Sequence, residues 1–169
     1  TCVVIDPSSY EKEIKEFVKS KKLKLLGIVL THSHFDHYGL SNKLAEEFAV
    51  KIYVYHDEKP MFKLLKMAYE CGFPIIKPNW DNFVFFNSEE LKLGDITFKI
   101  LVTPGHTTGG IVLIYNNVFF TGDTLFVDAI GRTDFEGGDM KAIMESVYKI
   151  AKDMKENDYL LCGHGQIYP

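Results

Sequence analysis

The sequence predicts a single domain of the α/β (α+β) class, in which mixed sheets carry helices on their outer faces. Its 169 residues match one compact domain, at roughly 150 residues per domain. Helices and strands are predicted to alternate in the first half, and a strand-rich stretch, a helix and a strand follow. This order of elements is typical of sheets with helices packed outside them. We therefore expect residues 1–169 to form one domain.

The first half of the chain is predicted to alternate strands and helices. Apolar runs predict strands at 2–5, 23–30 and 51–55. Apolar residues at helical spacing predict helices at 10–21, 40–50 and 60–71. Ser8 and Glu11 resemble a capping box at the start of the first helix. Polar loops are expected at 32–39 and at 72–82, and the second loop carries Pro74.

The second half is predicted to be richer in strands. Apolar runs predict strands at 83–86, 96–102, 111–115 and 118–121. The pair Asn116-Asn117 between the last two strands indicates a tight hairpin. An amphipathic helix is expected at 139–154 and a final strand at 159–162.

Charge and composition exclude several classes of protein. The net charge of -4 argues against a nucleic-acid partner, because a polyanion would be repelled overall. The longest apolar run is shorter than the roughly 18 residues that a membrane span requires, so we expect no membrane partner. The chain has 3 cysteines without CxxC spacing. We therefore expect no disulfide scaffold and a reducing, cytoplasmic compartment.

Several predicted strands end in a histidine or an aspartate, which follows small or turn-forming residues. The segments are 30–32, 102–106, 120–123 and 161–164. Loops that a rigid sheet holds at the ends of strands are where functional sites usually form. Such loops, each with a side chain that can bind a metal, predict one convergent site.

The segment from Thr31 to His37 carries the strongest signal. It reads Thr-His-Ser-His-Phe-Asp-His, with no Lys or Arg among its ligand candidates. Neutral imidazole and carboxylate groups suit zinc, iron or manganese. In an extended segment His32, His34 and Asp36 lie on one side and His37 on the other, so a turn here could serve two metal ions. A His-rich surface loop or a helix cap is the alternative.

Three later residues extend the candidate site. His106 stands in a Gly/Pro turn directly after a strand. Asp123 follows a nearly all-apolar run, where a carboxylate is costly unless a cation or hydrogen bonds meet it. His164 lies between two glycines, which give the backbone the freedom to approach a metal closely. The alternatives are capping or exposed residues and an Asx turn.

In chain order these residues resemble the pattern of the metallo-β-lactamase superfamily. The pattern is His32-x-His34-x-Asp36-His37, then His106, Asp123 and His164. The stretches 103–107, 120–126 and 131–134 are most similar to those of glyoxalase II-like (hydroxyacylglutathione hydrolase-like) hydrolases. The resemblance implies a four-layer αββα sandwich with mixed sheets and a dinuclear site along one edge. It also implies that terminal elements of the family are missing from this chain.

The resemblance assigns the ligands to two divalent metal ions. It places His32, His34 and His106 on one ion and Asp36, His37 and His164 on the other, with Asp123 bridging them. Zinc is the first expectation for the metal, with iron or manganese as alternatives. Asp123 stands where one group of true β-lactamases carries a cysteine, which argues against antibiotic hydrolysis.

The function implied by the resemblance is hydrolysis of a small-molecule thioester, such as a glutathione thioester, by a metal-bridging hydroxide. Two cations that share a water can lower its pKa to about 7. A thiol with a pKa of about 8.5 leaves as a thiolate without a strong general acid. Asp36 and Asp123 are the catalytic candidates, and Asp36 could shuttle protons. The alternatives are a persulfide dioxygenase with a single non-heme iron and a non-catalytic metal-binding module.

Two further residues are candidates for substrate binding. Arg132 could bind a substrate carboxylate, or could equally pair with an acidic neighbour such as Asp134 to hold its loop. Tyr38 could line the cleft, with packing in the core as the alternative. The missing terminal elements would expose a sheet edge, and a second copy of the chain covering that edge would make a homo-oligomer.

Overall fold

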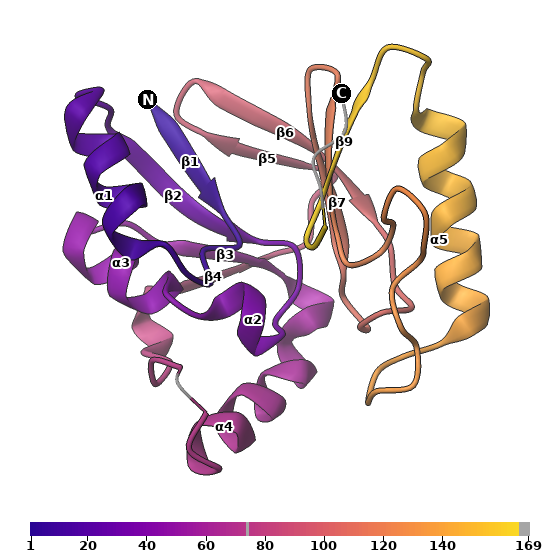
Figure 1. Cartoon of the computed structure of the whole chain (residues 1–169), viewed down its shortest axis with the longest axis horizontal. Coiled ribbons are helices and arrows are strands. Elements are labelled where there is room, and N and C mark those ends of the chain that lie inside the picture. Colours follow the sequence, from indigo (N-terminus) through magenta and orange to yellow (C-terminus); the bar gives the residue numbers. More distant parts are fainter. Residues whose placement is uncertain (74, 166–169) are drawn as a thin grey trace.

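Two β-sheets packed face to face form the centre of the protein, and helices cover the outer face of each (Figure 1). The computed structural model describes residues 1–73 and 75–165. Pro74, expected in a loop, lies outside the described residues. The arrangement confirms the predicted αββα sandwich. None of the helices in the described ranges is long and apolar enough to cross a membrane.

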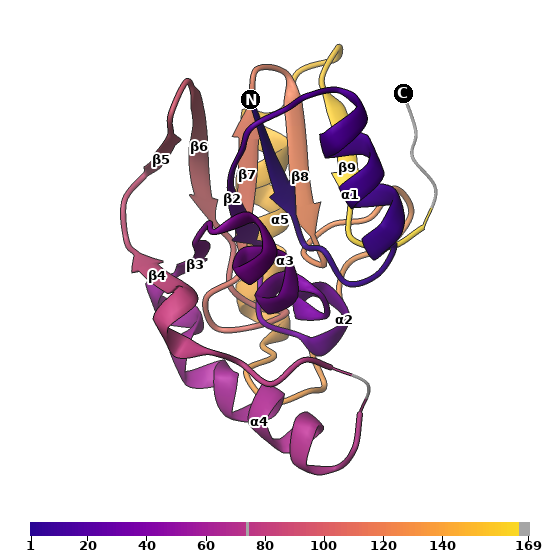
Figure 2. The ribbon, with the colours of Figure 1, turned by 90° about the vertical axis from the view of Figure 1, so that its left-hand side faces the viewer.

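The first sheet is parallel throughout, which explains the alternation of helices and strands. Its strands pair in the order β1 (Cys2–Ile5), β2 (Leu25–Leu30), β3 (Ile52–Tyr55) and β4 (Phe83–Phe86). Parallel neighbours require crossover connections, which are usually helical. The connections contain α1 (Glu11–Ser20), α2 (Phe35–Tyr38), α3 (Ser41–Phe48), α4 (Phe62–Glu70) and two 3-10 helices, η1 (His56–Met61) and η2 (Trp80–Asn82). Figure 2 shows α1, α2 and α3 in front of the sheets and α5 behind them.

The second sheet is mostly antiparallel. Its strands pair in the order β5 (Glu90–Leu93), β6 (Ile96–Val102), β7 (Ile111–Tyr115), β8 (Val118–Gly122) and β9 (Tyr159–Cys162). The predicted hairpin joins β7 to β8, with Asn116 at a φ of 54°. Among the strands that the structure describes in this sheet, only β8 and β9 are parallel neighbours, and α5 (Met140–Asp153) makes the crossover between them.

Three apolar clusters fill the spaces between the layers. Leu30, Leu44 and Ile52 are fully buried between the first sheet and its helices. Val29 and Leu113 belong to the cluster between the two sheets. The third cluster, between the second sheet and α5, includes Val112 and Ile150. Burial of apolar surface on both faces of each sheet stabilises the sandwich and fixes the positions of the strand ends.

The structure corrects some details of the predicted elements. β5 was not predicted, because Glu90–Leu93 alternates exposed charged residues with buried leucines and has only two apolar residues. The loop expected at 32–39 contains α2. The capping box is wrong, because Tyr10 occupies the N-cap position of α1 and no side chain caps the helix. Glu11 instead pairs with Lys43, at 2.6 Å.

Candidate metal centre

The seven candidate ligands meet at one edge of the sandwich. They come from the segments that follow β2, β6, β8 and β9. β6 and β8 are each antiparallel to β7, and β8 is parallel to β9, so the carboxyl ends of these three strands share an edge. The strand-end pattern predicts this convergence, and the structure brings the seven side chains together.

The first group of donors consists of His32, His34 and His106. Each offers a ring nitrogen within 4.8 Å of the others. His34 Nδ1 and His106 Nε2 lie 2.9 Å apart. His32 Nε2 is buried and has no hydrogen-bond partner among the described residues. We name this set the three-histidine group.

The second group consists of Asp36, His37 and His164, which also offer donor atoms within 4.8 Å of one another. His37 Nε2 and His164 Nε2 lie 3.2 Å apart. Asp36 Oδ2 lies 3.2 Å from His164 Nε2. We name this set the mixed group. The helical turn of α2 presents Asp36 and His37, whereas His32 and the extended N-cap residue His34 precede this helix.

Asp123 lies between the two groups. Its Oδ1 is 3.2 Å from His37 Nε2, and its Oδ2 is 3.4 Å from His164 Nε2 in the mixed group. Oδ2 also lies 3.7 Å from His106 Nε2 in the three-histidine group. A single carboxylate therefore faces both donor groups, which is the arrangement that a bridging ligand requires.

Hydrogen bonds behind the ligands orient the imidazole rings. His37 Nδ1 lies 2.8 Å from Asp6 Oδ2, and His106 Nδ1 lies 2.8 Å from the carbonyl oxygen of Arg132. These acceptors require that each Nδ1 carries a proton, so the Nε2 atoms face the centre and are the atoms that can bind a cation. His32 Nδ1 contacts Thr31 Oγ1 at 3.0 Å, and that hydroxyl donates to Asp6 at 2.6 Å.

Asp6 is a functional residue that the sequence analysis missed. It accepts hydrogen bonds from the backbone and hydroxyl of Thr31 and from His37. The missed signal is that Asp6 directly follows β1, as the predicted ligands follow their strands. Asp6 also forms a possible donor group with His32 and His37. Because its Oδ2 already accepts two hydrogen bonds, we interpret Asp6 as a residue that orients ligands.

The residues fit a pair of divalent cations. The facing ring nitrogens lie 2.9 Å and 3.2 Å apart, so each pair must have either a proton or a cation between its two nitrogen atoms. His32 Nε2 is buried without a partner, and a buried polar atom is costly in that state. Imidazole and carboxylate donors together suit zinc, iron or manganese.

The two groups differ in their affinity for protons. Burial, and then the neighbouring histidines, hold the pKa of His32 well below its usual range. Burial and His106 lower the pKa of His34 to about 4. For His37 burial acts in the same direction, but the carboxylates of Asp6 and Asp123 outweigh it and raise the pKa to about 10. At pH 7 the metal-free protein therefore has neutral His32 and His34 and a protonated His37.

This difference predicts that loading the site with zinc at pH 7 releases at least one proton per chain. A cation can occupy the mixed group only when His37 gives up its Nε2 proton, so affinity there should rise with pH up to about 10. Titration calorimetry in two buffers of different ionisation enthalpy would measure the release. Zinc uptake with no proton release would contradict the assignment.

A cavity of about 680 Å³ opens beside the donor groups. The candidate ligands that line it are His34, Asp36, His106, Asp123 and His164. The remaining wall is mostly apolar and is formed by Phe35, Leu64, Phe126, Ile130 and Phe135, with Arg132 and Glu136. A small molecule in this cavity can therefore reach both groups while its apolar part contacts the wall.

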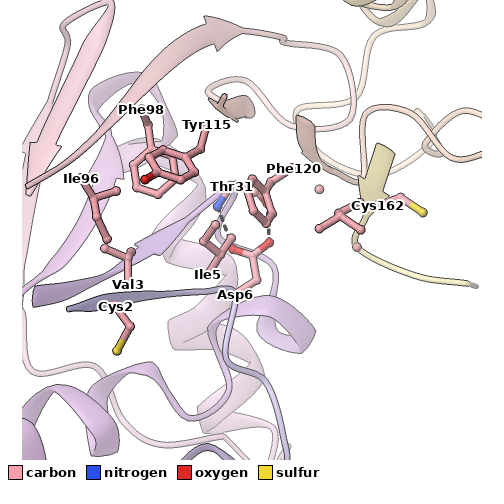
Figure 3. A pocket seen from close by; sticks show the side chains of 13 residues that line it. Cys2, Val3, Ile5, Asp6, Thr31, Ile96, Phe98, Tyr115, Phe120 and Cys162 are labelled. Atoms are coloured by element: carbon pink, nitrogen blue, oxygen red, sulfur yellow. Dashed lines mark hydrogen bonds between the residues drawn. The ribbon is translucent and has the colours of Figure 1, made fainter. Parts of the chain in front are cut away.

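A second cavity, of about 510 Å³, lies behind the site between β1 and the second sheet (Figure 3). Its lining is mainly apolar and includes Ile5, Phe98 and Phe120. Asp6 and Thr31 form one part of its wall, and Figure 3 draws the hydrogen bonds between them. This cavity borders the residues that orient His32 and His37 but does not include the seven ligand candidates.

The structure separates the two candidates for substrate binding. The Arg132 guanidinium donates two hydrogen bonds of 2.7 Å to Asp134 and lies 3.7 Å from the centre of the Phe135 ring. It both lines the cavity and holds its loop. Tyr38 is fully buried and packs in the core with Phe83. The structure therefore places Tyr38 in the core, the alternative given for it, and not among the residues that line the cavity.

Comparisons with known proteins agree with this geometry. The family model of the metallo-beta-lactamase superfamily matches residues 1–164. Hydroxyacylglutathione hydrolase GloC of Haemophilus influenzae is 35% identical over 171 residues, which cover 96% of this chain and 79% of GloC. The structure of BLEG-1, a B3 metallo-beta-lactamase, gives a TM-score of 0.85 at 32% identity over 98% of this chain and 82% of that chain. TTHA1623 in a di-iron-bound form gives 0.84 at 28% identity over 96% and 81%.

Proposed function

The chain belongs to the metallo-β-lactamase superfamily, and we propose that it is a metal-dependent hydrolase of small thioesters. The substrates would be of the hydroxyacylglutathione type. The observation that carries the proposal is the pair of donor groups that share Asp123 beside an open cavity. The identity to GloC, whose name states this activity, supports the substrate class.

Two divalent ions, zinc in the first instance, are the cofactors of this proposal. The three-histidine group would hold one ion and the mixed group would hold the other. Asp123, which faces both groups, would be a ligand of both ions. Bound divalent ions supply an acidified water and polarise a carbonyl group. The di-iron-bound form of TTHA1623 makes iron the alternative metal.

The side chains around the cavity favour a substrate with a good leaving group. Among the described residues, three carboxyl groups line the cavity. Asp36 and Asp123 contact histidines of the donor groups, and Glu136 forms an ion pair with Lys63. None of these is free to act as a strong general acid. A thiolate, whose conjugate acid has a pKa of about 8.5, departs without one, whereas the amine of an amide does not.

The lining also suggests how a thioester would lie. The apolar wall formed by Leu64, Phe126, Ile130 and Phe135 can contact carbon-rich parts of the substrate. Arg132 can offer its guanidinium to a carboxylate at the far end of the thiol half while Asp134 and Phe135 hold it in place. A carboxylate-bearing thiol such as glutathione fits this arrangement.

The test is an assay of the zinc-loaded protein with a hydroxyacyl thioester of glutathione, in which a thiol-reactive dye follows thiol release. We expect kcat/KM of about 10⁴ M⁻¹s⁻¹ or more, and loss of activity after chelation. A chromogenic β-lactam is the comparison substrate for the zinc-loaded protein. Glutathione persulfide, with oxygen consumption as its readout, is the comparison substrate for the iron-loaded protein, because zinc supports no redox chemistry. Faster turnover of either comparison substrate, or no thioester cleavage, would contradict the proposal.

A further inference from the structure

Glu58 is a fully buried carboxylate in η1, outside the candidate ligands. Its Oε1 accepts hydrogen bonds from the backbone N–H of Ser33 at 2.9 Å and from the Ser33 hydroxyl at 2.8 Å. Its Oε2 accepts hydrogen bonds from the Thr107 hydroxyl at 2.8 Å and from the backbone N–H of Gly109 at 2.9 Å. One side chain therefore joins two segments that lie far apart in the sequence.

These segments carry the three-histidine group. Ser33 stands between His32 and His34, and Thr107 directly follows His106. Each ligand of this group is thus adjacent in sequence to a residue that Glu58 holds. The distance between the two oxygens of one carboxylate is fixed, so this contact sets the separation of the segment after β2 from the segment after β6.

We propose that Glu58 is a positioning residue that holds His32, His34 and His106 in the geometry of one metal ion. The inference shares one premise with the proposed function, which is that the three-histidine group binds a metal ion. By fixing the two segments before the ion arrives, Glu58 removes the ordering cost that binding would otherwise include. Ser33, Thr107 and Gly109 are its partners in this role.

The backbone of Glu58 is in close contact with the segment that follows His106. A Cβ at position 109 would lie 2.0 Å from the backbone nitrogen of Glu58, so only glycine fits there. The neighbouring Thr108 hydroxyl also donates to the Asp57 carbonyl oxygen at 3.0 Å. η1 and the segment after His106 therefore contact each other along their backbones as well as through the carboxylate.

Hydrogen bonds, rather than a cation, offset the cost of burying the Glu58 carboxyl group. A buried carboxylate is costly unless hydrogen bonds or a cation compensate it. In the described part of the chain, neither Lys nor Arg forms an ion pair with Glu58, and its four hydrogen bonds come from neutral donors. Each of those donors belongs to a segment that presents a ligand.

The variant Glu58→Gln tests the inference, because it keeps the shape of the side chain while its NH2 group replaces an oxygen acceptor. One backbone N–H, of Ser33 or Gly109, then loses its acceptor. We expect the affinity of the three-histidine group for zinc to fall by about 10- to 100-fold, as measured by competition with a chromophoric chelator. With cobalt bound, the ligand-field absorption of this group should change.

Glu46→Gln is the control, because Glu46, an exposed residue of α3 outside the candidate ligands and the cavity lining, also accepts hydrogen bonds from neutral donors, Asn42 and Asn79. It should bind both ions as the wild type does. If Glu58→Gln does not fold, Thr107→Val removes one donor and should weaken zinc binding several-fold.

A purely structural role would lower the unfolding temperature of the metal-free protein and leave zinc affinity and the cobalt spectrum unchanged. That result in Glu58→Gln, or in Thr107→Val where the first variant does not fold, would overturn the inference. A wild-type protein that binds two ions but cleaves no thioester would overturn the proposed function alone. A wild-type protein that binds no ion would overturn both.

Discussion

Replacing Asp123 by asparagine should lower kcat/KM for the thioester by about 10³-fold or more and remove at least one bound ion. Asparagine keeps the size of the side chain but removes the negative charge that faces both donor groups. Bound metal contributes several kcal/mol of transition-state stabilisation, and about 1.4 kcal/mol corresponds to a tenfold change in rate. Steady-state kinetics and elemental analysis of the purified variant would measure both effects.

The matched control for this variant is Asp128→Asn in the same loop. Asp128 is exposed, so its loss should leave activity and metal content within about twofold of the wild type. If Asp123→Asn retained two ions and turned over within tenfold of the wild type, Asp123 could not be the shared ligand.

Replacing Gly163 by alanine should abolish most of the activity although glycine offers no ligand. A Cβ at this position would lie 2.2 Å from Asp123 Oδ1 and 2.5 Å from His37 Cε1. The methyl group must displace one of these two side chains, and a shift of about 1 Å at a catalytic group can cost about 10²-fold in rate. Kinetics and a zinc titration would show a fall in both turnover and affinity.

Gly72→Ala makes the same chemical change in open space and serves as the control. A Cβ at position 72 has no neighbour within 4 Å, and the φ of +82° costs stability without touching the site. This variant should lose about 1 kcal/mol of folding free energy and no activity. Wild-type kinetics in Gly163→Ala would show that Asp123 and His37 do not have the arrangement described.

The position of the site could be predicted from sequence because of the topology. His106, Asp123 and His164 each follow an apolar strand within a few residues, and sheets of this class place several such strand ends at one edge. The residues that present ligands are close in sequence to the strands that hold them. A local pattern was therefore enough to find them.

The residues that orient the ligands could not be predicted in the same way. Glu58 acts on Ser33 and Gly109, which are 25 and 51 positions away in the chain. Asp6 acts on His37, 31 positions away. These contacts depend on how the loops pack against one another, and in sequence a buried Glu58 resembles any exposed acidic residue of a loop. Arg132 is a further case, because its backbone carbonyl, rather than its side chain, contacts His106.

The count and location of bound metal ions test the central claim most directly. Anomalous scattering from crystals of the zinc-loaded protein should show two ions per chain, one within bonding distance of the three-histidine group, one within bonding distance of the mixed group, and both contacting Asp123. A single iron per chain in protein purified without added metal would favour the dioxygenase instead. Metal peaks away from these seven side chains, or no bound metal at all, would contradict the account.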